Sequence, residues 1–139
     1  MKIFCVVLLV VVACASLPVV VSAQQGGKYE VAGVSDERAA EKFFRDLQEA
    51  VAKDERARVA SMFDYPVYVR GRRTLRLKRR ADLLRRYDAV FNGKVKRALA
   101  AQKASELFVN YQGIMIGDGE IWFGQNAKNN KLGIIAINN

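Results

Sequence analysis

The chain has 139 residues, 51% of them hydrophobic and 27% charged, with a net charge of +9 at pH 7. It contains no histidine, which excludes serine–histidine and cysteine–histidine nucleophile pairs and zinc sites that use histidine. Both cysteines, Cys5 and Cys14, precede residue 24, so a chain that begins there has no disulfide. Its length suits a single domain with a substantial core.

Residues 1–23 have the layout of a secretory signal peptide. An apolar run is interrupted by Pro18 and ends at the small residues Val21-Ser22-Ala23, where a signal peptidase would cut. Cleavage near Ala23 predicts a secreted or periplasmic protein with no membrane span in the mature chain. Two alternatives remain. The run nearly reaches the length of a spanning helix, roughly 20 residues, and the segment before Cys14 is similar to the lipobox of bacterial lipoproteins.

The next segment, residues 24–35, is glycine-rich and predicts a flexible lead-in with a short strand near Tyr29 to Val31. A single domain is predicted over residues 36–139. Ser35 is a candidate cap for a helix that ends at Lys53, and Asp54 is a candidate cap for a second, shorter helix. Apolar residues recur in the first helix at helical spacing, namely Ala40, Phe43, Phe44, Leu47 and Val51.

The middle of the chain combines strand and helix signals. Residues 65–69 have strand composition and follow the end of the helices because Pro66 disfavours helix before it. Gly71 permits a turn into a second strand over residues 73–78. A third helix is predicted from about residue 80 to residue 91, where Asn92-Gly93 is a stop signal. A short helix over residues 94–102 follows.

The C-terminal third predicts sheet. One strand begins at Leu107, and a hairpin over residues 114–123 turns at Asp118-Gly119, a pair that favours positive φ at both positions. A last strand covers residues 132–137. Because helices and strands are segregated along the chain, the fold class is α+β with a mostly antiparallel sheet.

These strands are apolar on both faces. One face of the hairpin carries Ile114, Ile116, Ile121 and Phe123, and the other carries Met115 opposite Trp122. In the last strand, alternation places Leu132, Ile134 and Ala136 on one face and Ile135 and Ile137 on the other. Since an antiparallel sheet with one wet face alternates apolar and polar residues, both faces need cover. The pattern favours a strongly bent sheet, a homodimer through the sheet, or both.

Several segments together resemble small exported bacterial domains of the nuclear-transport-factor-two-like fold. The likeness runs from about Ser35 to Ile137 and rests on residues 43–51, Asp54, Tyr65-Pro66, residues 83–91 and residues 112–122. It implies a cone, in which N-terminal helices pack in a strongly bent, mostly antiparallel sheet that leaves a pocket at its wide end. Members often dimerise through the sheet. Their activities differ, so the resemblance implies a fold and not a reaction.

Aromatic and apolar side chains are the candidates for lining such a pocket: Tyr65, Tyr68, Tyr87, Tyr111, Met115 and Trp122. A cavity lined by them would suit a small apolar or amphipathic ligand. The alternative is that each packs in the core with its polar tip at the edge.

Two carboxylates, Asp64 and Asp88, are the candidates for proton transfer. In an apolar cone their pKa would rise, and a tyrosine would stabilise an oxyanion, as in a lyase or isomerase. Alternatively, Asp64 ends a helix and Asp88 pairs with Arg85 or Arg86 at the surface. No carboxylates cluster at the spacing of metal ligands, so neither a metal nor another cofactor is predicted.

The most distinctive segment is basic and contains one acid, Asp82. We call eight of its side chains the basic cluster: Arg70, Arg72, Arg76, Lys78, Arg79, Arg80, Arg85 and Arg86. Such a density predicts a positive face for an anionic partner, whether lipid headgroups, an acidic envelope polymer or an acidic protein; a solvated face with no partner is the alternative. Nucleic acid is less favoured because no stacking aromatics are interleaved. Arg73 either enters the cone or lies at the sheet edge.

Together these patterns predict an exported, non-enzymatic binding domain that holds a small ligand in the cone, docks an anionic envelope partner, or does both. A lyase or isomerase, and a dimeric structural or inhibitory protein without a ligand, are the alternatives.

Overall fold

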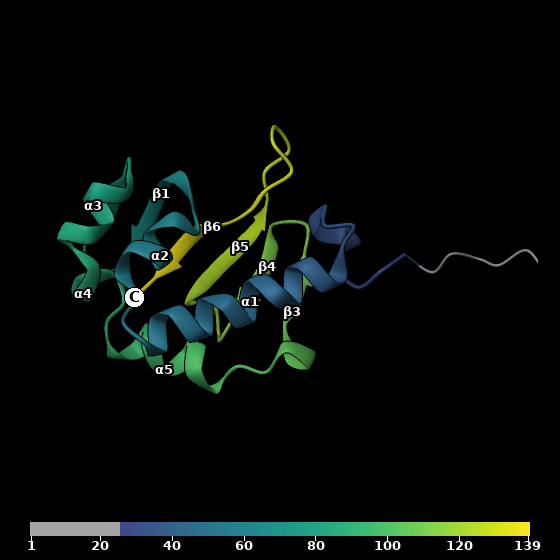
Figure 1. Ribbon diagram of the computed structural model, residues 1–139, viewed down its shortest axis with the longest axis horizontal. Helices are drawn as coiled ribbons and strands as arrows, with labels where there is room; N and C mark the ends of the chain where they lie inside the picture. The colour runs from purple at the N-terminus through teal and green to yellow at the C-terminus, as the bar shows by residue number, and fades with distance from the viewer. Residues whose placement is uncertain (1–25) are drawn as a thin grey trace, which may run out of the picture.

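The computed structural model describes residues 26–139, and the predicted signal peptide and Cys14 lie outside them. The described chain is an α+β domain of five α-helices and one open, mixed sheet (Figure 1). The helices are α1 (Glu37–Ala52), α2 (Arg56–Ser61), α3 (Arg80–Arg85), α4 (Tyr87–Val90) and α5 (Gly93–Ala101). The strands are β1 (Phe63–Arg70), β2 (Leu75–Leu77), β3 (Phe108–Asn110), β4 (Gly113–Ile116), β5 (Ile121–Gln125) and β6 (Leu132–Asn138).

The cap of the first helix lies one residue later than predicted. Asp36, rather than Ser35, caps α1, because its Oδ1 accepts a hydrogen bond from the backbone N–H of Ala39 at 3.0 Å. Lys53 ends α1 as predicted. The strand predicted near residue 29 is wrong. The segment Glu30–Ala32 is a 3₁₀ helix, and Tyr29 and Val34 on either side of it are buried in the core.

After β2, the structure has two short helices in the segment where the sequence predicted one. The segment breaks at Arg86 into α3 and α4. Asn92 then starts a helix, since its side chain accepts from the N–H of Val95 at 3.0 Å and caps α5. The predicted stop signal at Asn92-Gly93 thus acts as a start as well.

The six strands lie in the order β2-β1-β6-β5-β4-β3. Four of the five pairings are antiparallel, and only β1 and β6 run parallel. The sheet is therefore mostly antiparallel, as predicted. The parallel pairing joins β1, near the middle of the chain, to β6, the last strand, a long-range contact that local sequence patterns do not indicate.

The pairing of β4 with β5 confirms the predicted register. Ile114 lies opposite Phe123, Met115 opposite Trp122, and Ile116 opposite Ile121. The predicted two-residue turn is wrong, because four residues, Gly117–Glu120, connect the strands. Gly117 and Gly119 adopt positive φ, and Asp118 does not. Apolar pairing therefore determines the register here, and the turn adapts to it.

The last strand departs from simple alternation. Trp122 pairs with Ala136 and Phe123 with Ile134, so Ile135 is an extra residue in β6, a β-bulge. The bulge places Ile137 on the same buried face as Ile134, which corrects the predicted assignment of Ile137 to the opposite face. Ile135 instead lies over Gly113 and Gly124, where no side chain occupies the surface.

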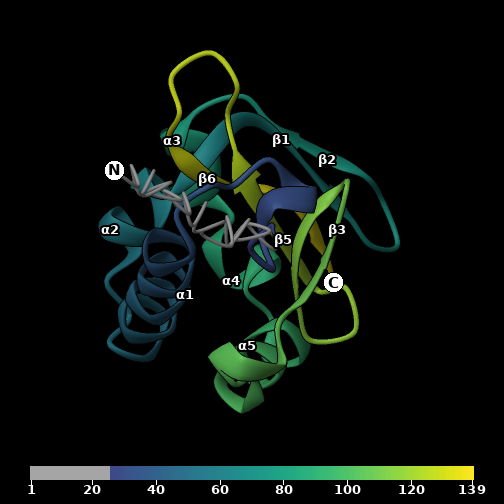
Figure 2. The ribbon, with the colours of Figure 1, turned by 90° about the vertical axis from the view of Figure 1, so that its right-hand side faces the viewer.

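One face of the sheet packs against the helices, and we call it the inner face. It contributes fully buried side chains, including Ile114 and Phe123, and the ring of Phe43 from α1 stacks on Phe123 with centroids 5.0 Å apart. Figure 2 shows α1 and α2 on one side of the sheet, with β2 and β3 at the opposite side of the molecule. Within residues 26–139, no helix is long and apolar enough to cross a membrane.

Candidate functional site

A groove between β2 and α3 collects most of the basic cluster. Its volume is about 560 Å³. Five of the eight clustered cations line it, namely Arg76, Lys78, Arg79, Arg85 and Arg86, together with Thr74, Leu75, Leu77 and Asp82. We call this feature the basic groove. It brings together residues from a strand, a turn and a helix.

Two buried leucines explain why the cations face outward. Leu77 on β2 and Leu83 on α3 are both buried in the core, so each anchors its element by one face. Arg76 and Lys78 flank Leu77 in the chain and are exposed, as is Arg85 on α3. The short connection from β2 to α3 keeps both sets of cations on the same side of the domain.

Asp82 holds this connection in place. Its Oδ2 accepts hydrogen bonds from the backbone N–H groups of Lys78 at 2.9 Å and Arg79 at 3.2 Å, and its Oδ1 pairs with the guanidinium of Arg85 at 2.5 Å. The N–H of Lys78 is the main cause that lowers the pKa of Asp82 below its ordinary value, with smaller contributions from Arg79 and Arg85. Asp82 is thus the one carboxylate in the groove, and it is fully occupied by structural contacts.

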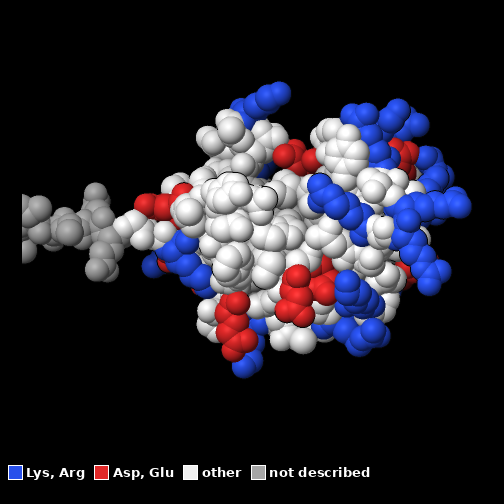
Figure 3. Space-filling view, turned by 180° about the vertical axis from the view of Figure 1, so that it is seen from behind, with Lys and Arg blue, Asp and Glu red and all other residues white. Residues whose placement is uncertain are grey.

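The cations of the basic cluster other than Arg85 are not neutralised within the domain. Apart from Arg85, none of them has a carboxylate within 4.0 Å among residues 26–139. All eight are exposed, and Arg70, Arg72 and Arg80 lie outside the groove. Figure 3 shows Lys and Arg gathered at the end of the molecule where α3 and the β1–β2 hairpin lie. Arg73 is exposed in the connection between β1 and β2, away from the inner face.

The six predicted pocket residues do not line one cavity. Tyr65 and Tyr87 lie toward the interior, and burial raises the pKa of each phenol to about 12. The hydroxyl of Tyr65 donates to the carbonyl of Ala60 at 2.9 Å, whereas the buried hydroxyl of Tyr87 has no partner in the described chain. Tyr68, Met115 and Trp122 lie on the opposite, outer face of the sheet, and Tyr111 is exposed between β3 and β4.

The two candidate carboxylates are engaged elsewhere. Both oxygens of Asp64 accept from the side-chain amide of Asn126 at 2.9 Å. Asp88 pairs with both terminal nitrogens of Arg56 at 3.0 and 2.9 Å, so its partner is not Arg85 or Arg86 as predicted. Among residues 26–139, no hydrogen bond joins either carboxylate to a tyrosine.

A second pocket, of about 390 Å³, lies between α1 and α5. It is lined by Gln48, Val51, Ala52, Asp54, Arg56, Lys96, Leu99 and Ala100. Arg56 and Lys96 also approach the ring of Tyr87, at 4.7 and 5.8 Å from its centroid. All eight lining residues come from α1, α5 or the α1–α2 region, and none from the sheet.

The sequence pattern predicted the cations of the basic groove on both β2 and α3, but not the leucines of the groove and not the pocket between α1 and α5. Leu75 and Leu77 line the basic groove, although their alternation with cations in residues 73–78 was a visible signal. Arg56 and Lys96 were overlooked because they are 40 residues apart in the chain (56 to 96), and only the packing of α5 near α1 brings them together.

No protein-family model matches the chain, and no curated protein or solved structure matches it significantly.

Proposed function

We propose that this protein is an exported, non-enzymatic binding domain that docks an anionic partner of the cell envelope in its basic groove. The observation that carries this proposal is the charge of the groove. Five cations line it, against one carboxylate that is already bonded to Lys78, Arg79 and Arg85. Clustered positive charges of this kind create a surface potential of several kT, which attracts anions.

The chemistry of the groove suits phosphate or carboxylate groups presented in a row. Arginine donates in a planar fork that matches either anion, and four of the five cations in the groove are arginines. The half-buried Leu75 adds a small apolar surface for the non-polar part of such a partner. The basic residues are held on two short elements anchored by buried leucines, so the backbone that carries them is already ordered before binding.

Export and the fold relationship belong to the same proposal. The layout of residues 1–23 supports cleavage near Ala23 and a secreted or periplasmic protein. Two helices, α1 and α2, that precede a mostly antiparallel, open sheet support the resemblance to nuclear-transport-factor-two-like domains. Intact mass of the exported protein tests the first of these, because cleavage at Ala23 and acylation at Cys14 leave chains of different mass.

Charge reversal in the groove tests the docking function. We expect Lys78→Glu/Arg86→Glu to weaken binding of inorganic polyphosphate by at least about tenfold at low salt. Raising NaCl from about 0.02 M to about 0.5 M should abolish binding by the unmodified protein. The matched control is Lys128→Glu/Lys131→Glu, which makes the same change in net charge in the exposed loop between β5 and β6. Equal losses in the two variants would show that net charge, and not the groove, binds the anion.

A second candidate is a small amphipathic ligand in the pocket between α1 and α5. Its volume of about 390 Å³ lies within the range of ligand sites, and it combines Val51 and Leu99 with the cations Arg56 and Lys96. We expect octanoate to raise the melting temperature of the protein and Lys96→Glu to cancel that rise. No shift with octanoate at millimolar concentration would exclude this ligand class.

A further inference from the structure

The outer face of the sheet carries one continuous row of side chains. Strand pairing places Phe108 beside Met115, Met115 beside Trp122, and Trp122 beside Ala136. The row continues from Ala136 to Tyr68 and from Tyr68 to Arg76. We call it the outer row: Phe108, Met115, Trp122, Ala136, Tyr68 and Arg76, one from each strand. At about 4.8 Å between strands, it spans about 24 Å.

This row is apolar and accessible over most of its length. Phe108 and Tyr68 are 52% and 44% exposed, and Met115, Trp122 and Ala136 are half-buried. The bulged Ile135 adds apolar surface beside them, over Gly113 and Gly124. Figure 3, seen from the side opposite α1, shows uncharged surface over the middle of the molecule. A contiguous apolar patch of this kind marks an interaction surface.

The basic cluster adjoins one end of the outer row. Arg76 belongs to both, since it ends the row, lies over the ring of Tyr68 at 5.8 Å and lines the basic groove. Arg70 lies two residues after Tyr68 on the same face of β1 and pairs with Asn138. An apolar, aromatic surface therefore passes directly into a cationic one.

We propose that the outer row and the basic cluster together form a docking surface for an anionic lipid bilayer. The proposal rests on the anion-docking function above and names its partner class. Phospholipid headgroups would bind the cations, and the aromatic side chains would enter the interfacial region, where tryptophan and tyrosine are favoured. A soluble polyanion would engage the cations alone and leave the outer row in water.

Charge favours a bilayer over a second copy of the chain. A homodimer through the sheet is the competing use of this face, and the one the sequence analysis anticipated. The outer row of a second copy contains no carboxylate that could pair with the cluster, so a dimer would leave these cations without an anionic partner. An anionic membrane surface attracts the same cluster, by about fivefold in affinity for each Lys or Arg near it.

Trp122 is a built-in reporter because it is the only tryptophan in the chain and occupies the middle of the row. We expect its fluorescence to shift to the blue, and to resist quenching by acrylamide, with vesicles of equal parts phosphatidylglycerol and phosphatidylcholine. Vesicles of phosphatidylcholine alone should produce neither effect. The exported form of the protein is used throughout, and intact mass confirms that all variants share one N-terminus, so differences between variants arise from the described domain.

Two variants separate the halves of the surface. Phe108→Ser alters an exposed residue at the end of the row farthest from the groove, and should weaken binding to the mixed vesicles by about tenfold while leaving polyphosphate binding unchanged. Arg79→Gln/Arg86→Gln should weaken vesicle binding by about 30-fold and polyphosphate binding as well. Tyr111→Ser, an 82% exposed tyrosine outside the row, is the matched control and should bind as the unmodified protein does.

The outcomes distinguish this inference from the function on which it rests. Binding of polyphosphate without a change in Trp122 fluorescence on mixed vesicles would contradict docking to a bilayer. The proposed docking of an anion in the basic groove would still stand. Failure of both would overturn both. A Trp122 shift that grows with protein concentration without lipid, with a doubled mass in sedimentation, would assign the outer row to a second copy and overturn the bilayer.

Discussion

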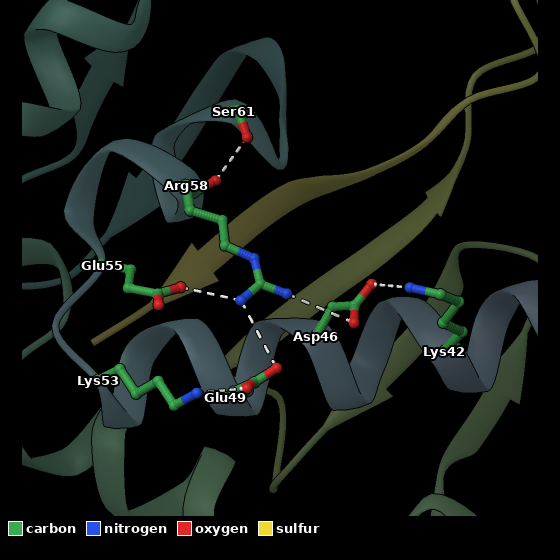
Figure 4. A network of polar contacts seen from close by, with 7 residues as sticks. All are labelled: Lys42, Asp46, Glu49, Lys53, Glu55, Arg58 and Ser61. Atoms are coloured by element: carbon green, nitrogen blue, oxygen red, sulfur yellow. Dashed lines mark hydrogen bonds and ion pairs between the residues drawn. The ribbon is translucent and has the colours of Figure 1, made fainter.

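The surface of α1 and α2 and the basic cluster differ in how their positive charges are matched. On α1 and α2, Arg58 lies 3.5, 3.6 and 2.9 Å from carboxylates of Asp46, Glu49 and Glu55 (Figure 4). Lys42 and Lys53 pair with Asp46 and Glu49 at 2.6 Å each. In the basic cluster, Arg85 alone of the eight cations pairs with a carboxylate of residues 26–139, that of Asp82.

The difference shows which charges serve the fold and which are available to a partner. Hydrogen bonding to Glu55 raises the pKa of Arg58, and hydrogen bonding to Lys53 lowers the pKa of Glu49. Charges on α1 and α2 thus stabilise one another. Those of the basic cluster repel one another, a cost that an external anion would remove. Substitutions of the same kind should therefore have opposite effects on stability at the two surfaces.

The largest effect is expected where the matched network is broken at its centre. Arg58→Glu replaces three attractions with three repulsions, and we expect the melting temperature to fall by about 6 °C. Thermal unfolding followed by circular dichroism measures this. Arg45→Glu is the matched control, because Arg45 has one partner, Glu41 at 3.3 Å. If the melting temperature fell equally in both variants, the network around Arg58 would contribute no more stability than a single ion pair.

Removing the one acid of the basic cluster should act on both stability and binding. Asp82→Asn weakens the bonds to Lys78 and Arg79, and we expect the melting temperature at neutral pH to fall by about 4 °C. Polyphosphate affinity should rise about fivefold, because a negative charge leaves the groove. A fall in affinity would mean that the shape of the β2–α3 connection matters more than its charge.

The same variant predicts a pH dependence. Because folding lowers the pKa of Asp82 below its ordinary value of 3.8, its carboxylate stabilises the fold at pH values above that range. The contribution is lost as pH falls through the lowered value. Melting curves recorded between neutral pH and about pH 2 should therefore converge for Asp82→Asn and the unmodified protein. A difference in melting temperature that stayed constant across this pH interval would show that the charge of Asp82 does not stabilise the fold.

Neutralising a cation of the cluster should stabilise the domain. We expect Arg86→Gln to raise the melting temperature by about 2 °C at low salt, because it relieves repulsion from neighbouring cations. High salt should erase the gain by screening. A lower melting temperature in low salt would show that Arg86 contributes packing through its alkyl chain.

The smallest effect belongs to an exposed pair within one helix. Lys53→Gln removes the pairing of Lys53 with Glu49 one turn away on α1, and we expect the melting temperature to fall by about 1 °C. Its sign is opposite to that of Arg86→Gln, although both substitutions remove one positive charge. These opposite signs are the most direct test of the difference between the two surfaces. Changes of the same sign in both variants would refute it.

The site was only partly predictable from the chain. Basic residues close together in sequence remain close in space, so the groove was indicated by composition, and five of the eight predicted cations line it. The scattered pocket residues failed to converge because the two faces of a strand separate neighbours. Tyr68 lies on the outer face, whereas Tyr65 and Tyr87 face the interior.

Local patterns alone determined the fold class, the helix α1 and the pairing of β4 with β5, since periodicity and apolar matching act over short stretches of chain. Only the tertiary structure decided the parallel pairing of β1 with β6, the bulge at Ile135 and the contact of Arg56 with Asp88. Each of these depends on where distant segments meet, and packing in the shared core sets that, not the residues nearby in sequence.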